Sequence, residues 1–435
     1  MEEALGVGLL GLGVVGRGVL EALQRNARAY EARGGRRLEV RAAAVRNVAA
    51  RAELAAAGLS VVADPRAVAT RPDIDLVVEL MGGEEPATGC IEAALSAGKS
   101  VVTANKEVMA KSGPALLKLA EACGAELRYE ASVGGGIPII GVLQRDLQAN
   151  EVSSVRAIIN GTTNYMITAM SRDGMSYEDA LADAQRLGYA EADPTNDVDG
   201  IDAAYKLAIL ASLAFHSQIG PEDVHCEGIR LLTARDFFHA RNLGYSIRML
   251  ATARQTPLGL DLRVHPTLVP TEDPMAGVEG VLNAVSVSGE PIGSVVLEGP
   301  GAGAGATSSA VVADILEVAG RLVSGQTPRR LRQIDQSPRF ASLADIHVRT
   351  YLRLEVPDRA GVLAELGAAF AAEGVSIASV LQTPHPERSQ SADLIVTTHA
   401  CSDGALDRVL QGLDRSDSEI ELGVRIRIED GCDND

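Results

Sequence analysis

The glycines near the N-terminus constrain the fold of this chain more than any other feature. Gly11, Gly13 and Gly16 follow an apolar run at residues 5–10 and open a segment with helical periodicity. In this strand–turn–helix context the first glycine permits a tight turn, the second lets a pyrophosphate approach the backbone, and the third lets the helix pack on the strand. A glycine turn with a purely structural role is the alternative. The dinucleotide-binding residues that we predict here are Gly11, Gly13, Val14, Val15 and Gly16.

Alternating apolar runs and helical patterns predict the rest of the architecture. Runs at residues 38–45, 75–80 and 99–103, with helices between them, are typical of βαβ units and a parallel sheet. The region after residue 345 has a βαββαβ order, typical of a small independent module. The predicted domains are a Rossmann-type nucleotide-binding α/β domain at 1–127, rejoined by about 306–322, an α+β catalytic and dimerisation domain at 128–305, a linker at 323–345, and a ferredoxin-like domain at 346–430.

Charge and cysteine content exclude several classes of function. The 435 residues carry a formal net charge of −18, whereas nucleic-acid binding needs clustered Lys and Arg. The five cysteines are scattered without CxxC spacing, which is typical of reduced thiols and not of a disulfide framework or a zinc site. No apolar run reaches the length of a membrane span. We therefore expect a cytoplasmic protein with no nucleic-acid or membrane partner.

The ends of two predicted strands bear on the cofactor. An acidic residue after the second strand would hold the ribose 2′-hydroxyl of NAD, whereas an arginine can accept the 2′-phosphate of NADP. Arg46 stands there without a carboxylate, which favours NADP(H); a solvated arginine and equal use of NAD(H) is the alternative. Thr103 and Lys106 follow a further strand at the edge where open sheets bind ligands. Lys106 could reach the nicotinamide or the substrate, or be a surface lysine.

Two further segments carry candidate chemistry. Residues 188–206 carry five carboxylates over a loop and the helix that follows it, where Asp202 and Lys206 share one face. A lysine beside a carboxylate could donate a proton in a site for a cationic substrate, or the pair could be a surface ion pair. Residues 129–137 combine Glu130 with flexible glycines, which suits a hard cation or a plain loop equally well.

These motifs occur together, and in this order, in one enzyme family. They include Thr-Ala-Asn-Lys at 103–106, Glu-Ala-Ser-Val-Gly-Gly-Gly-Ile-Pro at 130–138, Asn-Gly-Thr-Thr-Asn-Tyr at 160–165, Leu-Gly-Tyr-Ala-Glu-Ala-Asp-Pro at 187–194 and Gly-Ala-Gly-Ala-Gly-Ala-Thr at 301–307. Over about residues 1–320 the chain resembles the homoserine dehydrogenases. The module with Val-Pro-Asp-Arg-Ala-Gly-Val-Leu at 356–363 resembles an ACT domain, a type that binds small amino acids at a strand–helix turn. There is no kinase segment, so the resemblance is to the monofunctional form.

The resemblance implies reversible NAD(P)H-dependent reduction of L-aspartate 4-semialdehyde to L-homoserine, in threonine, methionine and isoleucine biosynthesis. It implies that Lys206 donates the proton, that Asp202 orients it and that Lys106 assists. The other implied sites are Glu191 and Asp197 for the substrate, Gly305 for the cofactor, Glu130, Val133, Gly135 and Ile137 for a monovalent cation (sodium), and Asp358, Arg359, Gly361 and Val362 for the effector. Asn196 departs from some relatives, which carry an aspartate there.

The resemblance further implies feedback inhibition, which we expect from threonine, and a homodimer or homotetramer. Two other readings of the sequence remain open. Another ACT-regulated dehydrogenase would need a catalytic His–Glu pair, which is not recognisable in this chain. A non-catalytic amino-acid sensor would show decay of the catalytic segment, yet Glu191, Asp202 and Lys206 are all present.

Overall fold

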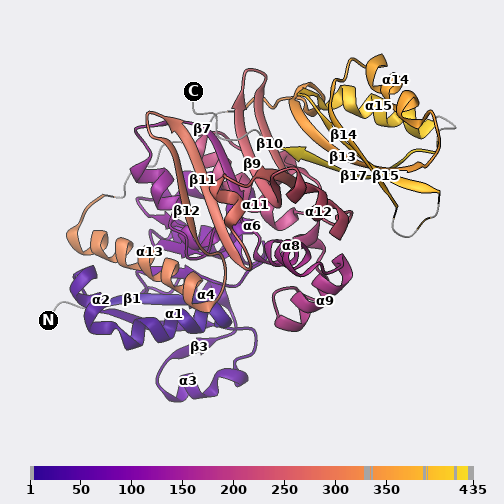
Figure 1. Cartoon of the computed structure of the whole chain (residues 1–435). Helices are drawn as coiled ribbons and strands as arrows, with labels where there is room; N and C mark the ends of the chain where they lie inside the picture. The colour runs from indigo at the N-terminus through magenta and orange to yellow at the C-terminus, as the bar shows by residue number, and fades with distance from the viewer. Residues whose placement is uncertain are drawn as a thin grey trace. The chain divides into compact units, whose positions relative to one another are not determined.

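The computed structural model describes residues 4–327, 334, 337–385, 388, 390–415 and 419–429. Figure 1 shows the helices and strands along the chain, which contacts divide into two compact units. Unit 1 comprises Met1–Val152, Tyr205–Asp223 and Asn283–Ser337, and unit 2 comprises Ser153–Ala204, Val224–Leu282 and Pro338–Asp435. Within the described residues, no helix combines the length and apolarity that a membrane crossing needs.

Unit 1 contains a six-stranded parallel sheet in the order β3-β2-β1-β4-β5-β6. Its strands are β1 (Leu5–Leu10), β2 (Leu38–Ala44), β3 (Ser60–Val62), β4 (Leu76–Glu79), β5 (Ser100–Thr103) and β6 (Leu127–Arg128). This is the doubly wound order of dinucleotide-binding sheets, in which the ligand binds beyond the carboxyl ends of β1 and β4, where the strand order reverses. The predicted Rossmann-type domain is confirmed.

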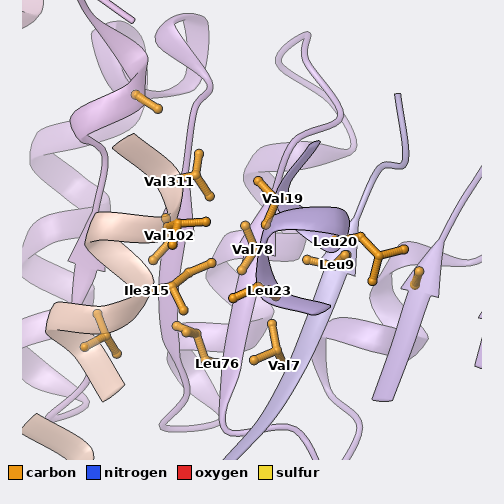
Figure 2. Close-up of a cluster of buried hydrophobic side chains, with 14 of the residues drawn as sticks. Val7, Leu9, Val19, Leu20, Leu23, Leu76, Val78, Val102, Val311 and Ile315 are labelled. Atoms are coloured by element: carbon orange, nitrogen blue, oxygen red, sulfur yellow. The ribbon is translucent and has the colours of Figure 1, made fainter. Parts of the chain in front are cut away.

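Helices cover the sheet of unit 1 and explain why its strands are continuous apolar runs. Val7, Leu9 and Val78 of the sheet are buried against Val19 of α1 and Ile315 of α13 (Figure 2). Strands buried on both faces need apolar residues at every position, not an alternating pattern. The helices are α1 (Val14–Arg25), α2 (Ala27–Gly34), α3 (Ala52–Ala56), α4 (Pro65–Ala69), α5 (Ala87–Ser96), α6 (Lys106–Ala122), α7 (Ile139–Gly141) and α13 (Ala304–Ser324), with the short η1 (Ala49–Arg51), η2 (Glu130–Ser132), η4 (Pro221–Asp223) and the π-helix η3 (Val142–Asp146).

Helix α13 returns to this core from late in the chain. It contacts α1, α2 and β5, the packing that a nucleotide-binding domain rejoined by residues 306–322 requires. The helix begins at Ala304, within the glycine–alanine run and slightly before the predicted segment of about 306–322. Unit 1 also holds the neighbouring strands β11 (Leu282–Glu290) and β12 (Gly293–Pro300). The exact domain boundaries stay predictions.

Unit 2 is built on the strand order β7-β9-β10-β17-β13-β15-β14. Its strands are β7 (Glu151–Ile158), β8 (His225–Cys226), β9 (Tyr245–Thr256), β10 (Gly259–Pro270), β13 (His347–Pro357), β14 (Ile377–Pro384), β15 (Ser391–Thr398), β16 (Cys401–Ser402) and β17 (Glu421–Ile428). Its helices are α8 (Gly161–Asp173), α9 (Tyr177–Leu187), α10 (Thr195–Val198), α12 (Ala234–Asn242), α14 (Val362–Ala372) and α15 (Asp403–Arg415), with η5 (Pro274–Gly277) and η6 (Leu343–Asp345). Helix α11 (Ile201–Ala214) runs from unit 2 into unit 1.

The C-terminal region has the predicted βαββαβ order, β13-α14-β14-β15-α15-β17, so this part of the fold class is confirmed. It is not an independent module, however. Strand β17 pairs in parallel with β10, where Thr267 lies opposite Arg427 and Leu268 opposite Ile428. The paired residues are far apart in sequence, and no local pattern announces such a pairing. The predicted linker at 323–345 lies partly outside the described residues; its described parts include the end of α13 and η6.

Candidate active site

The glycine turn after β1 has the geometry that a dinucleotide requires. Gly11 has a φ of +103°, and a Cβ there would lie 2.7 Å from the carbonyl oxygen of Leu80. A Cβ at Gly16 would lie 2.2 Å from the carbonyl oxygen of Gly11, so α1 can approach the turn only without a side chain. A Cβ at Gly13, the residue before α1, would meet no atom within 4 Å. The protein itself needs the first and third glycines, and the second leaves open space at a helix N-terminus, where a pyrophosphate fits.

A cavity of about 300 Å³ in unit 1 lies among the segments that follow β1, β4 and β5. Lys106 and Lys206 both line it, together with Val15 of α1. The structure therefore brings together residues that are 100 positions apart in the sequence. The other lining residues are Leu80, Met81, Gly82, Ala104, Asn105, Ala131, Ser132, Gly134, Gly135, Gly301, Ala302 and Thr307.

Of the predicted cofactor residues, Val15 and Lys106 line the cavity, whereas Gly11, Gly13, Val14 and Gly16 of the glycine turn and three residues outside that turn do not. Arg46 is exposed beyond the end of β2 and forms no hydrogen bond or ion pair with the described part of the chain. Thr103 is fully buried, and its hydroxyl donates to the carboxylate of Glu79. Gly305 lies in the first turn of α13, where a Cβ would meet no atom within 4 Å. Contacts of these three residues with a cofactor stay predictions.

The predicted cation loop follows β6. The Glu130 carboxylate accepts hydrogen bonds from the backbone N–H groups of Ile140 and Gly141, at 2.8 and 2.7 Å. Burial raises the pKa of Glu130, although these backbone N–H groups lower it in part. Gly134 and Gly135 have φ angles of +72° and +56°, which turn the backbone sharply between the predicted ligands. The Glu130 carboxylate has lone pairs to spare, and carboxylate and backbone carbonyl oxygens are ligand types that suit a hard cation.

The acidic segment lies around one asparagine in unit 2. Asn160 donates from its Nδ2 to Asp197 at 2.7 Å and to Asp202 at 2.9 Å. Its Oδ1 accepts from the backbone N–H of Thr163 at 2.8 Å, so the same side chain caps α8. Two predicted site residues are therefore held side by side by a residue to which we gave no role. An asparagine before Gly-Thr-Thr is a recognisable N-cap signal, but nothing local indicates what its amide nitrogen binds.

Comparison with known proteins decides the family. A model described as homoserine dehydrogenase matches residues 138–316, and one described as its NAD-binding domain matches residues 11–130. A model of the ACT domain matches residues 350–415. The homoserine dehydrogenase of Corynebacterium glutamicum is 40% identical over 431 residues, 98% of this chain and 96% of that protein. The chain belongs to the homoserine dehydrogenase family.

Solved structures of homoserine dehydrogenases agree. The enzyme from Thiobacillus denitrificans has a TM-score of 0.91 at 41% identity, over 98% of this chain and 99% of that one. A hyperthermophilic archaeal homoserine dehydrogenase in complex with NADPH has a TM-score of 0.63 at 28% identity, over 75% of this chain and 100% of that one. The predicted family and oxidoreductase class are confirmed, with a nicotinamide cofactor and an ACT domain. Membership of this family argues against both alternatives, a different ACT-regulated dehydrogenase and a non-catalytic sensor.

The carboxylates of the acidic segment at residues 188–206 that do not contact Asn160 have separate tasks. Asp193 accepts from the backbone N–H of Thr195 at 3.1 Å, and hydrogen bonds from Thr195 lower the pKa of Asp193. Asp199 forms a two-pronged ion pair with Arg230, at 2.6 and 3.1 Å. Glu191 is exposed. Asp193 and Asp199 thus stabilise the conformation of the loop, whereas the side chain of Glu191 is exposed to solvent.

The predicted effector residues form the turn between β13 and α14. Gly361 has a φ of +99° and precedes Val362, the buried first residue of α14. Asp358 accepts from Gln382 at 3.2 Å. Arg359 forms paired hydrogen bonds with Glu365, at 3.0 and 3.1 Å. The four residues stand at one strand–helix turn, the location at which ACT domains are expected to bind amino acids.

Proposed function

We propose that this chain reduces L-aspartate 4-semialdehyde to L-homoserine with NADPH, and that Lys206 donates the proton. The observation that carries the proposal is the cavity that Lys106 and Lys206 share, which also reaches the first turn of α1 through Val15. A glycine turn shaped for a pyrophosphate therefore leads to two ammonium groups at one cavity. That is the arrangement that hydride transfer to a carbonyl needs.

The lysines act on the carbonyl oxygen of the substrate. A bound nicotinamide supplies the hydride that reaches the carbonyl carbon. As negative charge grows on the oxygen, an ammonium within hydrogen-bond reach stabilises it and gives up its proton. Asp202 lies one turn before Lys206 on α11 and orients it, while Lys106, which lines the same cavity, holds the substrate. Glu191 binds the substrate's own ammonium group and Asp197 also contacts the substrate, as the family resemblance implies.

Turnover itself tests the activity. The wild-type chain should oxidise NADPH when aspartate 4-semialdehyde is added, and should reduce NADP⁺ when homoserine is added. The measurement is the change in NADPH absorbance. No turnover in either direction would overturn the proposed function.

The preference for NADPH rests on Arg46, an exposed guanidinium at the end of β2. The archaeal relative that was solved with NADPH supports it. Arg46→Ala should lower kcat/KM for NADPH by about tenfold, the value of one charge-assisted hydrogen bond, and leave NADH nearly unchanged. Arg28→Ala, another exposed arginine of unit 1, is the control. Equal losses with both cofactors would contradict the contact with the 2′-phosphate.

We also propose a sodium ion at Glu130, Val133, Gly135 and Ile137. Replacing sodium by choline should lower the melting temperature and the activity of the wild type, but not the melting temperature of Glu130→Gln.

We expect threonine to bind at the turn between β13 and α14 of the ACT domain and to inhibit turnover. Asp358→Ala should abolish inhibition and keep basal turnover; persistent inhibition would exclude this turn as the sensor.

The assembly and the location of the chain are also proposals. Sedimentation should give a dimer or a tetramer, and a monomer under assay conditions would contradict this. A cytoplasmic location is supported by the free thiols of Cys90, Cys123, Cys226 and Cys401. Fractionation of cells that produce the chain tests it, and recovery outside the cytoplasm would refute it.

A further inference from the structure

Glu79 is a buried carboxylate at the carboxyl end of β4 to which no role has been given. Its exposed fraction is 0%. Within the described residues it forms no ion pair with a lysine, arginine or histidine. An unpaired carboxylate is costly in an apolar interior, so one that persists there calls for an explanation. Burial raises its pKa, and the hydrogen bonds that it accepts lower it in part.

The carboxylate joins two backbone segments. One oxygen accepts from the backbone N–H of Met81 at 2.7 Å, and the other accepts from the Thr103 hydroxyl at 2.6 Å. Thr103 lies opposite Glu79 in the pairing of β4 with β5. The Thr103 hydroxyl in turn accepts from the backbone N–H of Asn105 at 3.0 Å. Glu79 thus connects the loop after β4 to the end of β5.

Asn105 completes a closed ring of hydrogen bonds that also includes Glu79 and Thr103. Its Nδ2 donates to the carbonyl of Gly83 at 2.7 Å, and Gly83 belongs to the loop after β4 that Glu79 also holds. Its Oδ1 accepts from the backbone N–H of Val108 at 3.2 Å and so caps α6, whose first residue is Lys106. The two joined segments supply six residues of the cavity wall: Leu80, Met81, Gly82, Ala104, Asn105 and Lys106.

We propose that Glu79 is a positioning residue for hydride transfer, which fixes the cavity wall and the start of α6 and thereby places Lys106. The proposal rests on the proposed function of this cavity. Glu79 itself is not among the residues that line the cavity, so it acts through Met81, Thr103 and Asn105.

The chemistry of the ring requires a carboxylate. Both partners of Glu79 donate hydrogen bonds, and an ionised carboxylate only accepts. A glutamine has the same shape but one acceptor oxygen, so one of the two donors would face an amide N–H. Glu79→Gln therefore disturbs the ring without changing the volume of the side chain.

The experiment compares Glu79→Gln, Thr103→Val, the double variant and Glu126→Gln. Glu126 is the matched control, because it is a buried carboxylate of unit 1 that pairs with Arg128 and Arg321 and is not among the residues that line the cavity. Steady-state kinetics give kcat and KM, hydrogen–deuterium exchange follows residues 80–83 and 103–108, and urea unfolding gives stability.

Glu79→Gln should lower kcat by about tenfold to a hundredfold, with smaller changes in KM, because misplaced groups lose the reactive geometry. Adding Thr103→Val should cost little more, because both substitutions break the same ring. Exchange should quicken in both segments in Glu79→Gln and in neither segment in Glu126→Gln. A kcat within twofold of wild type, with loss of stability alone, would overturn the proposal. Hydrogen–deuterium exchange in Glu79→Gln that equals exchange in the wild type would overturn the proposal, whether or not the wild type shows turnover. Absence of turnover in the wild type would by itself refute only the proposed function.

Discussion

At the scale of single residues, Asn160 shows how one side chain organises a site. Its two amide hydrogens go to Asp197 and Asp202, which otherwise would repel each other, while its oxygen caps α8. The sequence indicated the acids and the lysine, because their types and spacing carry chemistry. The sequence did not indicate that Asn160 forms a bridge between Asp197 and Asp202, because an asparagine at an N-cap position predicts only the local contact with its own helix. Glu79 escaped notice for a similar reason, since it ends a strand that otherwise reads as buried and apolar.

Asn160→Asp tests the bridge. Aspartate keeps the oxygen that caps α8 but loses both donors and adds a third carboxylate beside Asp197 and Asp202. We expect kcat/KM to fall by about tenfold to a hundredfold, since each hydrogen bond to a charged group contributes about 1.5–3 kcal/mol. Ser176→Ala removes the N-cap of α9 and shows how far a weakened helix start alone changes the kinetics. Equal kinetics for Asn160→Asp and wild type would argue against a role of the bridge in substrate binding.

At the scale of elements, four of the six strands of the parallel sheet were predicted, whereas β3, β6 and the start of α13 were not. Strand β1 falls at residues 5–10 as expected, because an apolar run before a glycine turn has few other solutions. Helix α13 begins at Ala304, inside a run of glycine and alanine that favours a loop on local propensity. Its packing on α1 stabilises the early turn, and this contact joins residues that are far apart in sequence.

The first turn of α13 gives a test of the predicted cofactor contact at Gly305. A Cβ would meet no atom within 4 Å at Gly305 or at Gly320, two glycines of the same helix. Replacing either by alanine should stabilise the chain by about 0.5–1 kcal/mol in urea unfolding. Only Gly305→Ala should weaken NADPH binding, measured by fluorescence titration, if the cofactor approaches that turn. Unchanged binding in both variants would remove Gly305 from the cofactor site.

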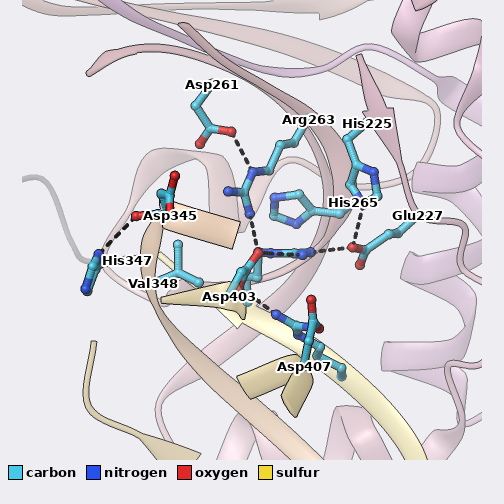
Figure 3. Close-up of polar contacts among 12 residues, drawn as sticks. His225, Glu227, Asp261, Arg263, His265, Asp345, His347, Val348, Asp403 and Asp407 are labelled. Atoms are coloured by element: carbon cyan, nitrogen blue, oxygen red, sulfur yellow. Dashed lines mark hydrogen bonds and ion pairs between the residues drawn. The ribbon is translucent and has the colours of Figure 1, made fainter. Parts of the chain in front are cut away.

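At the scale of the whole molecule, buried charges attach the ACT region to β10. Asp403 accepts from Arg263 at 2.9 Å (Figure 3). It also accepts from Arg427, at 2.9 and 3.1 Å. Arg263 is 1% exposed and lies on β10, whereas Arg427 lies on β17. Removing residues 346–435 would therefore uncover Arg263 and break the sheet. Regulation is therefore better tested with point variants. A truncation would be a suitable test only if the C-terminal region were an independent module.

Asp403→Asn tests this attachment. Breaking a buried ion pair by removing one charge costs about 3–5 kcal/mol, because the remaining guanidinium is left uncompensated. Urea unfolding at pH 7 should show a loss of that size. Asp407→Asn, a half-exposed partner of Arg425, should lose about 1 kcal/mol or less. Equal losses in the two variants would contradict the account.

The same pair of variants has a predicted pH dependence. Burial raises the pKa of Asp403, but the nearby Arg427, Arg425 and Arg263 lower it by a larger amount. The pKa of Asp403 in the folded chain therefore lies below the ordinary value of 3.8. A group with a lowered folded pKa contributes stability above its unfolded pKa and loses it as the pH falls through the folded pKa. The stability gap between wild type and Asp403→Asn should therefore narrow below about pH 4. A gap that widens on acidification would contradict the charge assignment.

The central claim is that Lys206, in a cavity shared with Lys106, donates the proton during hydride transfer. Its most direct test is the single-turnover rate of NADPH oxidation by aspartate 4-semialdehyde, measured by stopped-flow absorbance for wild type, Lys206→Ala and Lys118→Ala. Lys118 is an exposed lysine of α6 and serves as the control. We predict that Lys206→Ala slows this step by about 10²–10⁴-fold while NADPH affinity and the Lys118→Ala rate stay near wild type. A loss of less than tenfold in Lys206→Ala would contradict the account.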